Sequence, residues 1–322
     1  MSNCSLAVAG SPITNRHDLS NEMRGERVVI TGVTGQIAFG LAKHLAEHND
    51  VFGVARFSRP GSHDAVIEAG ITPIECDIAD GDFSSVPGDV TYLLHLAVAQ
   101  GPGFDYDKAI RTNAEGTGLL LQHCRAAKAA LVMSTHSVYK PHEDPFHVYR
   151  ESDPLGDPNV THAPTYGVSK IGQEAVARTC ARLFDLPVVI ARMNAAYDER
   201  GGLPTIHLRQ LLAGQSITTR WDPCTYQPIH QTDINLGVAG LLNAATAPAT
   251  IVNWAGDEVV SVQEWTAYMA ELLGIDTTVN CVEVPGSLRG SVADVTKRLA
   301  ATGPCIVSWR DGIADAVNKL TA

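Results

Sequence analysis

Short apolar runs alternate with longer stretches in which apolar residues recur every three or four positions between residues 27 and 192. The first run, residues 28–30, is made of β-branched residues and predicts a strand. Ile37, Leu41 and Leu45 then recur at helical spacing. The sequence therefore predicts a strand, a tight turn and a helix over residues 27–45.

Later apolar runs continue this alternation. They predict strands at residues 51–55, 71–75, 90–96, 131–134 and 187–192, and helices at residues 109–127 and 166–184. Strands separated by helices or long connections pair in parallel through crossovers, so the expected fold class is α/β with a doubly wound parallel sheet. After residue 192 the alternation weakens. Predicted helices at residues 203–213, 231–245 and 261–273 indicate a smaller C-terminal substrate-binding lobe.

Composition narrows the class of protein. A formal net charge of -11 disfavours a nucleic-acid partner and a membrane surface, because both need clustered Lys and Arg. Seven cysteines without a Cys-x-x-Cys pair indicate free thiols in a reducing compartment. The chain shows neither a signal-peptide pattern nor a run long enough for a membrane span, so we expect a cytoplasmic protein.

The turn after the first strand is the first candidate for chemistry. Gly32, Gly35 and Ala38 form a Gly-x-x-Gly-x-x-Ala pattern, in which small residues let a helix N-terminus approach an anion such as a pyrophosphate. A plain strand–turn–helix without a ligand is the alternative. The predicted division is a flexible leader at 1–25, a Rossmann-type NAD(P)-binding domain at 26–192, and a substrate-binding lobe with returning core elements at 193–322.

Tyr166 and Lys170 are the candidate acid–base pair. They stand four residues apart in a predicted helix, so their side chains share one face. An ammonium beside a phenol favours the phenolate and lowers the phenol pKa toward the working range of a general base. A single Tyr-x-x-x-Lys pair is more often structural, so its weight depends on the neighbouring motifs.

Several motifs together resemble the extended short-chain dehydrogenase/reductase family, the epimerase/dehydratase type. They occur in that family's order and cover nearly everything after residue 26. They are residues 31–38 (TGVTGQIA), Cys76-Asp77, 113–117 (NAEGT), 134–139 (STHSVY), 166–170 (YGVSK), 192–194 (RMN), 230–233 (HQTD) and 253–256 (NWAG).

The resemblance implies roles for individual residues. Tyr166 would transfer the proton, Lys170 would hold the nicotinamide ribose and tune Tyr166, and Thr135 would bond the reacting oxygen. The family also commonly forms homodimers through paired helices, so the apolar faces of the helices at 105–128 and 166–184 are either core or such a dimer interface. The cofactor-binding residues implied are Gly32, Thr34, Gly35, Gln36, Ile37, Arg56, Arg59, Asp77, Ile78, Leu96, Ala97, Asn113, Tyr166 and Lys170.

Two departures from the family pattern bear on the substrate. The family's sugar-nucleotide dehydratases carry an Asp-Glu pair after the catalytic Thr, whereas this chain has His136-Ser137, which disfavours dehydration. Many nucleotide-sugar epimerases carry a diphosphate-binding Arg four residues before the His of the His-x-x-Asp segment, where this chain has Tyr226. Arg220 or Arg289 are the candidate substitutes.

The end of the second strand bears on the cofactor. An acidic residue there would accept hydrogen bonds from the ribose 2′-hydroxyl, whereas Arg56 and Arg59 would attract a 2′-phosphate. The sequence therefore predicts NADP(H) rather than NAD(H), with a solvated pair of arginines as the alternative.

The sequence thus predicts an NADP(H)-dependent oxidoreductase that moves a hydride to or from a carbonyl or secondary alcohol of a small molecule. The alternatives are a nucleotide-sugar epimerase that retains its cofactor and, in another class, a regulatory protein that binds the cofactor without turnover. No metal is expected, because the irregular His and acidic residues of the 140–164 loop are better explained as solvated side chains.

Overall fold

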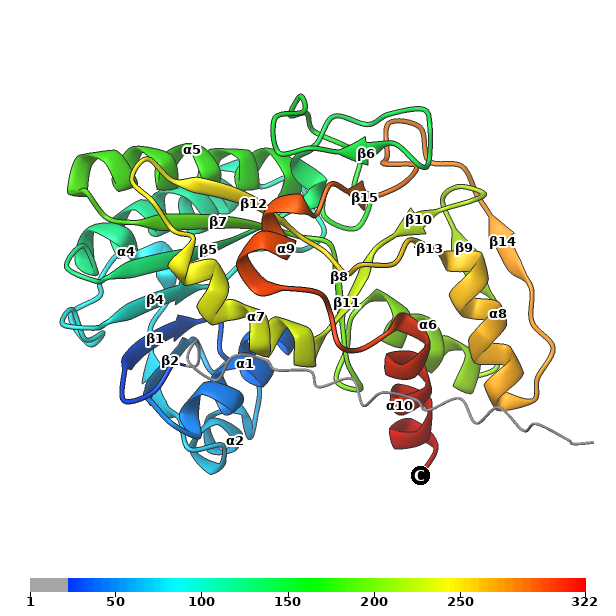
Figure 1. Ribbon diagram of the computed structural model, residues 1–322, viewed down its shortest axis with the longest axis horizontal. Helices are drawn as coiled ribbons and strands as arrows, with labels where there is room; N and C mark the ends of the chain where they lie inside the picture. The colour runs from blue at the N-terminus through cyan, green and yellow to red at the C-terminus, as the bar shows by residue number, and fades with distance from the viewer. Residues whose placement is uncertain (1–22) are drawn as a thin grey trace, which may run out of the picture.

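The computed structural model describes residues 23–322 and is built around one parallel sheet (Figure 1). The sheet has seven strands in the order β12-β7-β5-β4-β1-β2-β3, and every pairing in it is parallel. This is the doubly wound arrangement that the alternating pattern predicts. Its strands are β1 (Arg27–Thr31), β2 (Asp50–Ala55), β3 (Thr72–Glu75), β4 (Tyr92–His95), β5 (Ala129–Thr135), β7 (Val188–Met193) and β12 (Thr250–Trp254).

Helices cover both faces of this sheet, and each face has its own apolar core. Leu41 of α1 and Leu241 of α7 pack in one core, while Leu120 of α4 and Ala177 of α5 pack in the other. The sheet is therefore buried on both sides, as its β-branched strands require. The helices are α1 (Gln36–Ala46), α2 (Ser62–Glu68), α3 (Tyr106–Ile110), α4 (Gly116–His123), α5 (Tyr166–Phe184), α7 (Gln231–Asn243) and α9 (Thr296–Thr302).

A smaller lobe stands beside the carboxyl ends of the strands (Figure 1). Its core joins Leu208 of α6, Trp265 of α8 and Ile313 of α10. Short paired strands connect this lobe to the large sheet. Its helices are α6 (Leu203–Leu212), α8 (Val262–Leu273) and α10 (Trp309–Thr321), and the short strands are β6 (Val148–Tyr149), β8 (Ala195–Tyr197), β9 (Ile217–Thr219), β10 (Thr225–Tyr226), β11 (Pro228–His230), β13 (Val260–Ser261), β14 (Val279–Cys281) and β15 (Val292–Ala293).

The predicted helix at 109–127 is wrong in its form. The chain makes α3, then a π-helical turn, η3 (Arg111–Glu115), and only then α4, which ends at His123. The turn carries Asn113 inward, where its amide bonds both the N–H and the carbonyl of Ala99. The regular helix is thus interrupted where the Asn113 side chain forms the hydrogen bonds that the buried Ala99 backbone needs.

Other segments complete the comparison with the sequence. Short 3₁₀ turns occur at η2 (Ile78–Asp80) and η4 (His136–Val138), and α9 and α10 were not predicted. The predicted leader, residues 1–25, lies outside the described residues except for its last three. Across residues 23–322, every helix is too short or too polar to span a lipid bilayer.

Candidate active site

The glycine-rich turn closes the carboxyl end of β1. Gly32 has φ +72, and a Cβ there would lie 2.8 Å from the Ala97 Cα, so only glycine fits this approach. Gly35 is the N-cap of α1 and has no side-chain cap, which leaves the first amides of the helix free. Free amides at a helix N-terminus bind anions, so the turn suits a pyrophosphate.

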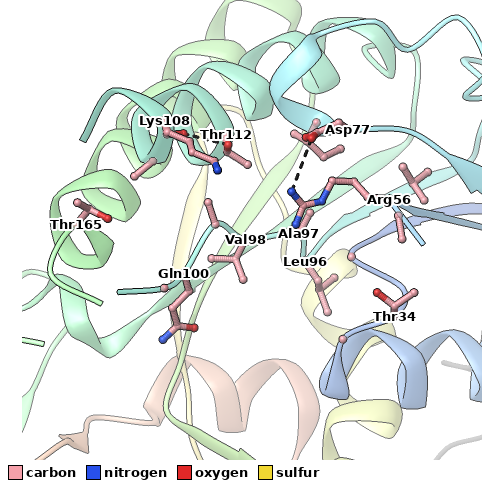
Figure 2. Close-up of a pocket in the computed structure, with 18 of the residues that line it drawn as sticks. Thr34, Arg56, Asp77, Leu96, Ala97, Val98, Gln100, Lys108, Thr112 and Thr165 are labelled. Atoms are coloured by element: carbon pink, nitrogen blue, oxygen red, sulfur yellow. Dashed lines mark hydrogen bonds and ion pairs between the residues drawn. The ribbon is translucent and has the colours of Figure 1, made fainter. Parts of the chain in front are cut away.

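A cavity of about 420 Å³ opens in front of this turn (Figure 2). In Figure 2, Arg56 and Asp77 lie on one side, and Lys108, Thr112 and Thr165 lie on the other. This position, beyond the carboxyl ends of β1, β2 and β4, is where doubly wound folds bind nucleotides. The predicted cofactor residues that line it are Gly32, Thr34, Gly35, Arg56, Arg59, Asp77, Ile78, Leu96 and Ala97.

The two arginines after β2 enter this cavity differently. The Arg59 guanidinium donates to the Thr34 carbonyl over 2.6 Å and so braces the glycine-rich turn. Arg56 lies 3.7 Å from the Asp77 carboxylate and has 63% of its side chain exposed (Figure 2). Arg56 is therefore the arginine with the freedom to contact a ligand.

A second cavity, of about 660 Å³, adjoins the first and carries the predicted catalytic residues. Gln36 and Ile37 line it from the start of α1, beside Thr135, Tyr166 and Lys170. The Thr135 and Tyr166 side chains are hydrogen-bonded to each other. The fold thus brings the Tyr166 phenol of α5 next to the Thr135 hydroxyl at the end of β5. The cavity that contains them adjoins the nucleotide site.

The electrostatics of the pair differ from the expectation. Desolvation raises the pKa of Tyr166, while its hydrogen bond with Thr135 acts to lower it. Lys170 donates instead to the Met133 carbonyl over 2.6 Å, and burial lowers its pKa to about 7. The expected lowering of the phenol pKa by the ammonium is therefore wrong for this arrangement of Lys170.

A buried ion pair stands one helical turn after Lys170. Glu174 accepts hydrogen bonds from Arg192 over 2.9 and 2.7 Å, and from the Ser134 hydroxyl over 2.5 Å. The nearby Glu174 charge acts to raise the pKa of Lys170, against the effect of burial. This pair ties α5 to β5 and β7 and so fixes the helix face that carries Tyr166 and Lys170.

Asn113 lies behind the wall of the cofactor cavity and lines neither cavity described so far. Its amide donates to the Ser169 hydroxyl over 2.9 Å and holds the Ala99 backbone. Asn113 therefore stabilises the wall of the cofactor cavity. Direct cofactor binding by Asn113 stays a prediction.

A third cavity, of about 80 Å³, begins at Thr135 and contains two arginines from the smaller lobe. The Arg220 guanidinium donates to the Tyr226 hydroxyl over 2.8 Å and lines both this cavity and the 660 Å³ cavity. The Arg289 guanidinium lies 4.2 Å from the centre of the Trp221 ring. Within residues 23–322, neither arginine forms an ion pair with a carboxylate.

Comparison with known proteins decides the family. Residues 28–222 match the family described as the NAD dependent epimerase/dehydratase family. The chain belongs to this family. The predicted membership and the predicted fold class are both confirmed.

Similar proteins cover almost the whole chain at low identity. An uncharacterized UDP-glucose epimerase, YtcB, of Bacillus subtilis (strain 168) is 23% identical over 320 residues, which span 92% of this chain and 98% of the relative. A UDP-glucuronic acid 4-epimerase from Bacillus cereus, solved with UDP-glucuronic acid and NAD, is 23% identical with a TM-score of 0.79, over 91% of this chain and 99% of that chain. A UDP-N-acetylglucosamine 4-epimerase from Methanobrevibacter ruminantium M1 has a TM-score of 0.80 at 20% identity, over 93% and 99%.

The epimerase/dehydratase family includes dehydratases, so the residue after Thr135 matters. The His136 Nδ1 and the Ser291 hydroxyl are hydrogen-bonded over 3.1 Å, and burial lowers the pKa of His136 to about 3. A neutral imidazole with this pKa is a poor proton donor near pH 7. His136 is therefore unsuited to the acid role in dehydration, and the expectation that dehydration is disfavoured stays a prediction.

Lys170 gives a prediction about stability. Burial lowers the pKa of Lys170 from 10.5 to about 7 in the folded protein. Between these pH values the unfolded chain binds more protons than the folded protein. The contribution of Lys170 to the free energy of unfolding therefore falls as the pH drops through this range. We measure the free energy of unfolding of Lys170→Met and of wild type by urea denaturation. The value for the variant should rise relative to that of wild type as the pH falls from 10 toward 7. A difference that does not change with pH would contradict the lowered pKa.

Proposed function

We propose that this protein is an epimerase that inverts one carbon of a sugar linked to a nucleoside diphosphate. The observation that carries the proposal is the pair of guanidinium groups, Arg220 and Arg289, in the cavity that begins at Thr135. Guanidinium groups without a carboxylate partner favour an anionic ligand, and a diphosphate is the anion they fit best. Tyr226 occupies the family's usual arginine position, and its hydroxyl holds Arg220 there instead.

The similar proteins support the same substrate class. The names of the Bacillus cereus and Methanobrevibacter ruminantium proteins give UDP-sugar 4-epimerases, and that of YtcB gives a UDP-glucose epimerase. The net oxidoreductase of small carbonyl compounds that the sequence first suggested rested on the position of Arg56 and on the missing arginine at position 226. Arg220, held by Tyr226, weakens the second of these arguments.

The residues suit a nicotinamide dinucleotide and have separable tasks. The turn at Gly32 and Gly35 would hold the pyrophosphate, and residues 26–192 would form the cofactor-binding part, with substrate contacts mainly from 193–322. When bound, the nicotinamide supplies hydride chemistry at the reacting carbon. The phenolate form of Tyr166 would take the proton of the reacting hydroxyl, and the phenol so formed would return it when the carbon is reduced again, while Thr135 would hold that oxygen by a hydrogen bond.

The assay for the proposal offers the protein UDP-glucose, UDP-glucuronic acid and UDP-N-acetylglucosamine separately, with NAD or NADP. We expect chromatography to show one of them converted to its epimer, without net reduction of the added cofactor. Consumption of NADPH by a simple ketone, with no epimer from any nucleotide sugar, would instead support the net oxidoreductase.

We further propose that the cofactor cavity accepts a 2′-phosphate, so that this protein binds NADP(H). The name of the solved Bacillus cereus neighbour gives NAD. Arg56 stands where an acidic residue would select NAD, and it is mostly exposed. Arg56→Ala should weaken NADPH binding by about 1 kcal/mol, since an exposed charge contact is weak, and leave NADH binding nearly unchanged. Equal losses for both cofactors in a fluorescence titration would contradict this role.

A further inference from the structure

A chain of contacts leads from the proposed diphosphate site to a buried histidine on α6. The Arg220 guanidinium bonds the Tyr226 hydroxyl, and the Tyr226 ring lies 5.6 Å from the Trp265 ring. The Trp265 indole N–H then donates to the His207 Nδ1 over 3.0 Å. His207 is therefore linked to Arg220 through two side chains, and His207, Arg220 and Thr135 line the same 660 Å³ cavity.

The bond from Trp265 fixes which nitrogen of His207 carries the proton. An indole N–H is a donor only, so the Nδ1 that it bonds must be the acceptor. Burial lowers the pKa of His207 to about 4, so the ring is neutral near pH 7 and holds its one proton on Nε2. His207 is thus a fixed neutral donor.

His207 borders a ligand-sized space. His207 is only 7% exposed, yet its ring lines the 660 Å³ cavity. In the described part of the chain, no acceptor pairs with its Nε2. The neighbouring wall is largely apolar, with Leu203, Ile206 and Val262, and Thr219 adds a hydroxyl. An apolar wall with one oriented donor beside it suits a heterocyclic base.

We infer that His207, held as an Nε2–H donor by Trp265, is a specificity residue that reads the C4 carbonyl oxygen of a pyrimidine base. The inference rests on the proposed function and narrows its substrate class to uracil or thymine nucleotides. Cytosine presents an amino group where uracil presents the C4 carbonyl. Two donors would then face each other unpaired, and a site built for a hydrogen bond rejects such a ligand strongly.

The test measures binding of UDP and CDP by calorimetry, which needs no turnover. Wild type should bind UDP at least about tenfold more tightly than CDP, since one buried hydrogen bond is replaced by two unpaired donors. His207→Leu should reduce that ratio to within about threefold, mainly by weakening UDP. His207→Gln should preserve much of the ratio if the Trp265 indole N–H bonds the amide oxygen as it bonds Nδ1, because the NH2 group is then the donor to the base.

Trp265→Phe tests whether the tautomer of His207, and not the packing around it, sets the preference for UDP. It keeps a ring beside His207 but removes the N–H that makes Nδ1 an acceptor, so the UDP preference should fall. Trp309→Phe is the matched control, because Trp309 is buried in the same core without a ring contact to His207. Its preference should equal that of wild type.

The outcomes separate this inference from the proposed function. If UDP binds well but the ratio of UDP to CDP affinity is unchanged in His207→Leu, the role of His207 is wrong and the nucleotide-sugar proposal stands. If wild type binds neither nucleotide, both are wrong. A fall in the ratio with Trp309→Phe equal to that with Trp265→Phe would show a packing effect and would also overturn the inference.

Discussion

Tyr166→Phe is expected to lower kcat by about two to four orders of magnitude, the usual effect of removing a general acid–base group. The variant keeps the ring on α5 but removes the hydroxyl that hydrogen-bonds Thr135 in the 660 Å³ cavity. Cofactor binding should barely change, because the backbone turn and the residues of the 420 Å³ cavity are untouched. The measurement is the initial rate of epimer formation at saturating nucleotide sugar.

Tyr92→Phe is the matched control for this variant. Tyr92 begins β4 at the opposite end of the strand from the site, and it lines none of the three cavities described. Its kcat should equal that of wild type. If Tyr166→Phe kept more than about a tenth of the wild-type kcat, a loss too small for a missing general acid, the proton would move through another group and the catalytic assignment would be wrong.

Arg220→Met should raise the KM for the nucleotide sugar by about 10- to 100-fold, with a smaller effect on kcat. A guanidinium–phosphate contact contributes roughly 1.5–3 kcal/mol, and Met keeps much of the side chain's length without its charge. Tyr226→Phe removes only the hydroxyl that holds Arg220, so it should give a smaller rise in KM in the same direction.

Arg209→Met provides the comparison for a lost surface guanidinium. Arg209 lies on α6, where its guanidinium bonds the carbonyls of Glu199 and Arg200, and it lines none of the three cavities. Its KM should stay close to that of wild type. An unchanged KM in Arg220→Met, and also in Arg289→Met, would remove the observation on which the substrate class depends.

The parts of the site that sequence predicted best are local in the chain. Gly32 and Gly35 stand three residues apart, and Tyr166 and Lys170 four apart, so strand and helix periodicity alone place them. The structure confirms β1, α1, β5, β7 and α5 close to their predicted bounds. α10 also left a signal that was missed, since Ile313, Ala316 and Val317 are buried at helical spacing after the Ser308 cap.

The parts that sequence could not supply depend on contacts between distant segments. His207 and Trp265 are 58 residues apart, and nothing in either segment indicates that an indole fixes the imidazole proton. Arg220 could be named as a substitute for the arginine missing at position 226, but only the fold shows that Tyr226 holds it. The pKa of Tyr166 was predicted in the wrong direction, because helical spacing reveals neither the burial that raises this pKa nor the bond from Lys170 to the Met133 carbonyl.

The most direct test of the central claim is epimerisation in D₂O, followed by NMR of the product. An enzyme that oxidises and then reduces the same carbon keeps that carbon's hydrogen away from solvent, since it leaves and returns as hydride. We predict that the nucleotide sugar is converted to its epimer with no deuterium at the inverted carbon and no accumulation of reduced cofactor. Deuterium at that carbon, or no epimer with stoichiometric NADPH oxidation by a ketone, would contradict the account.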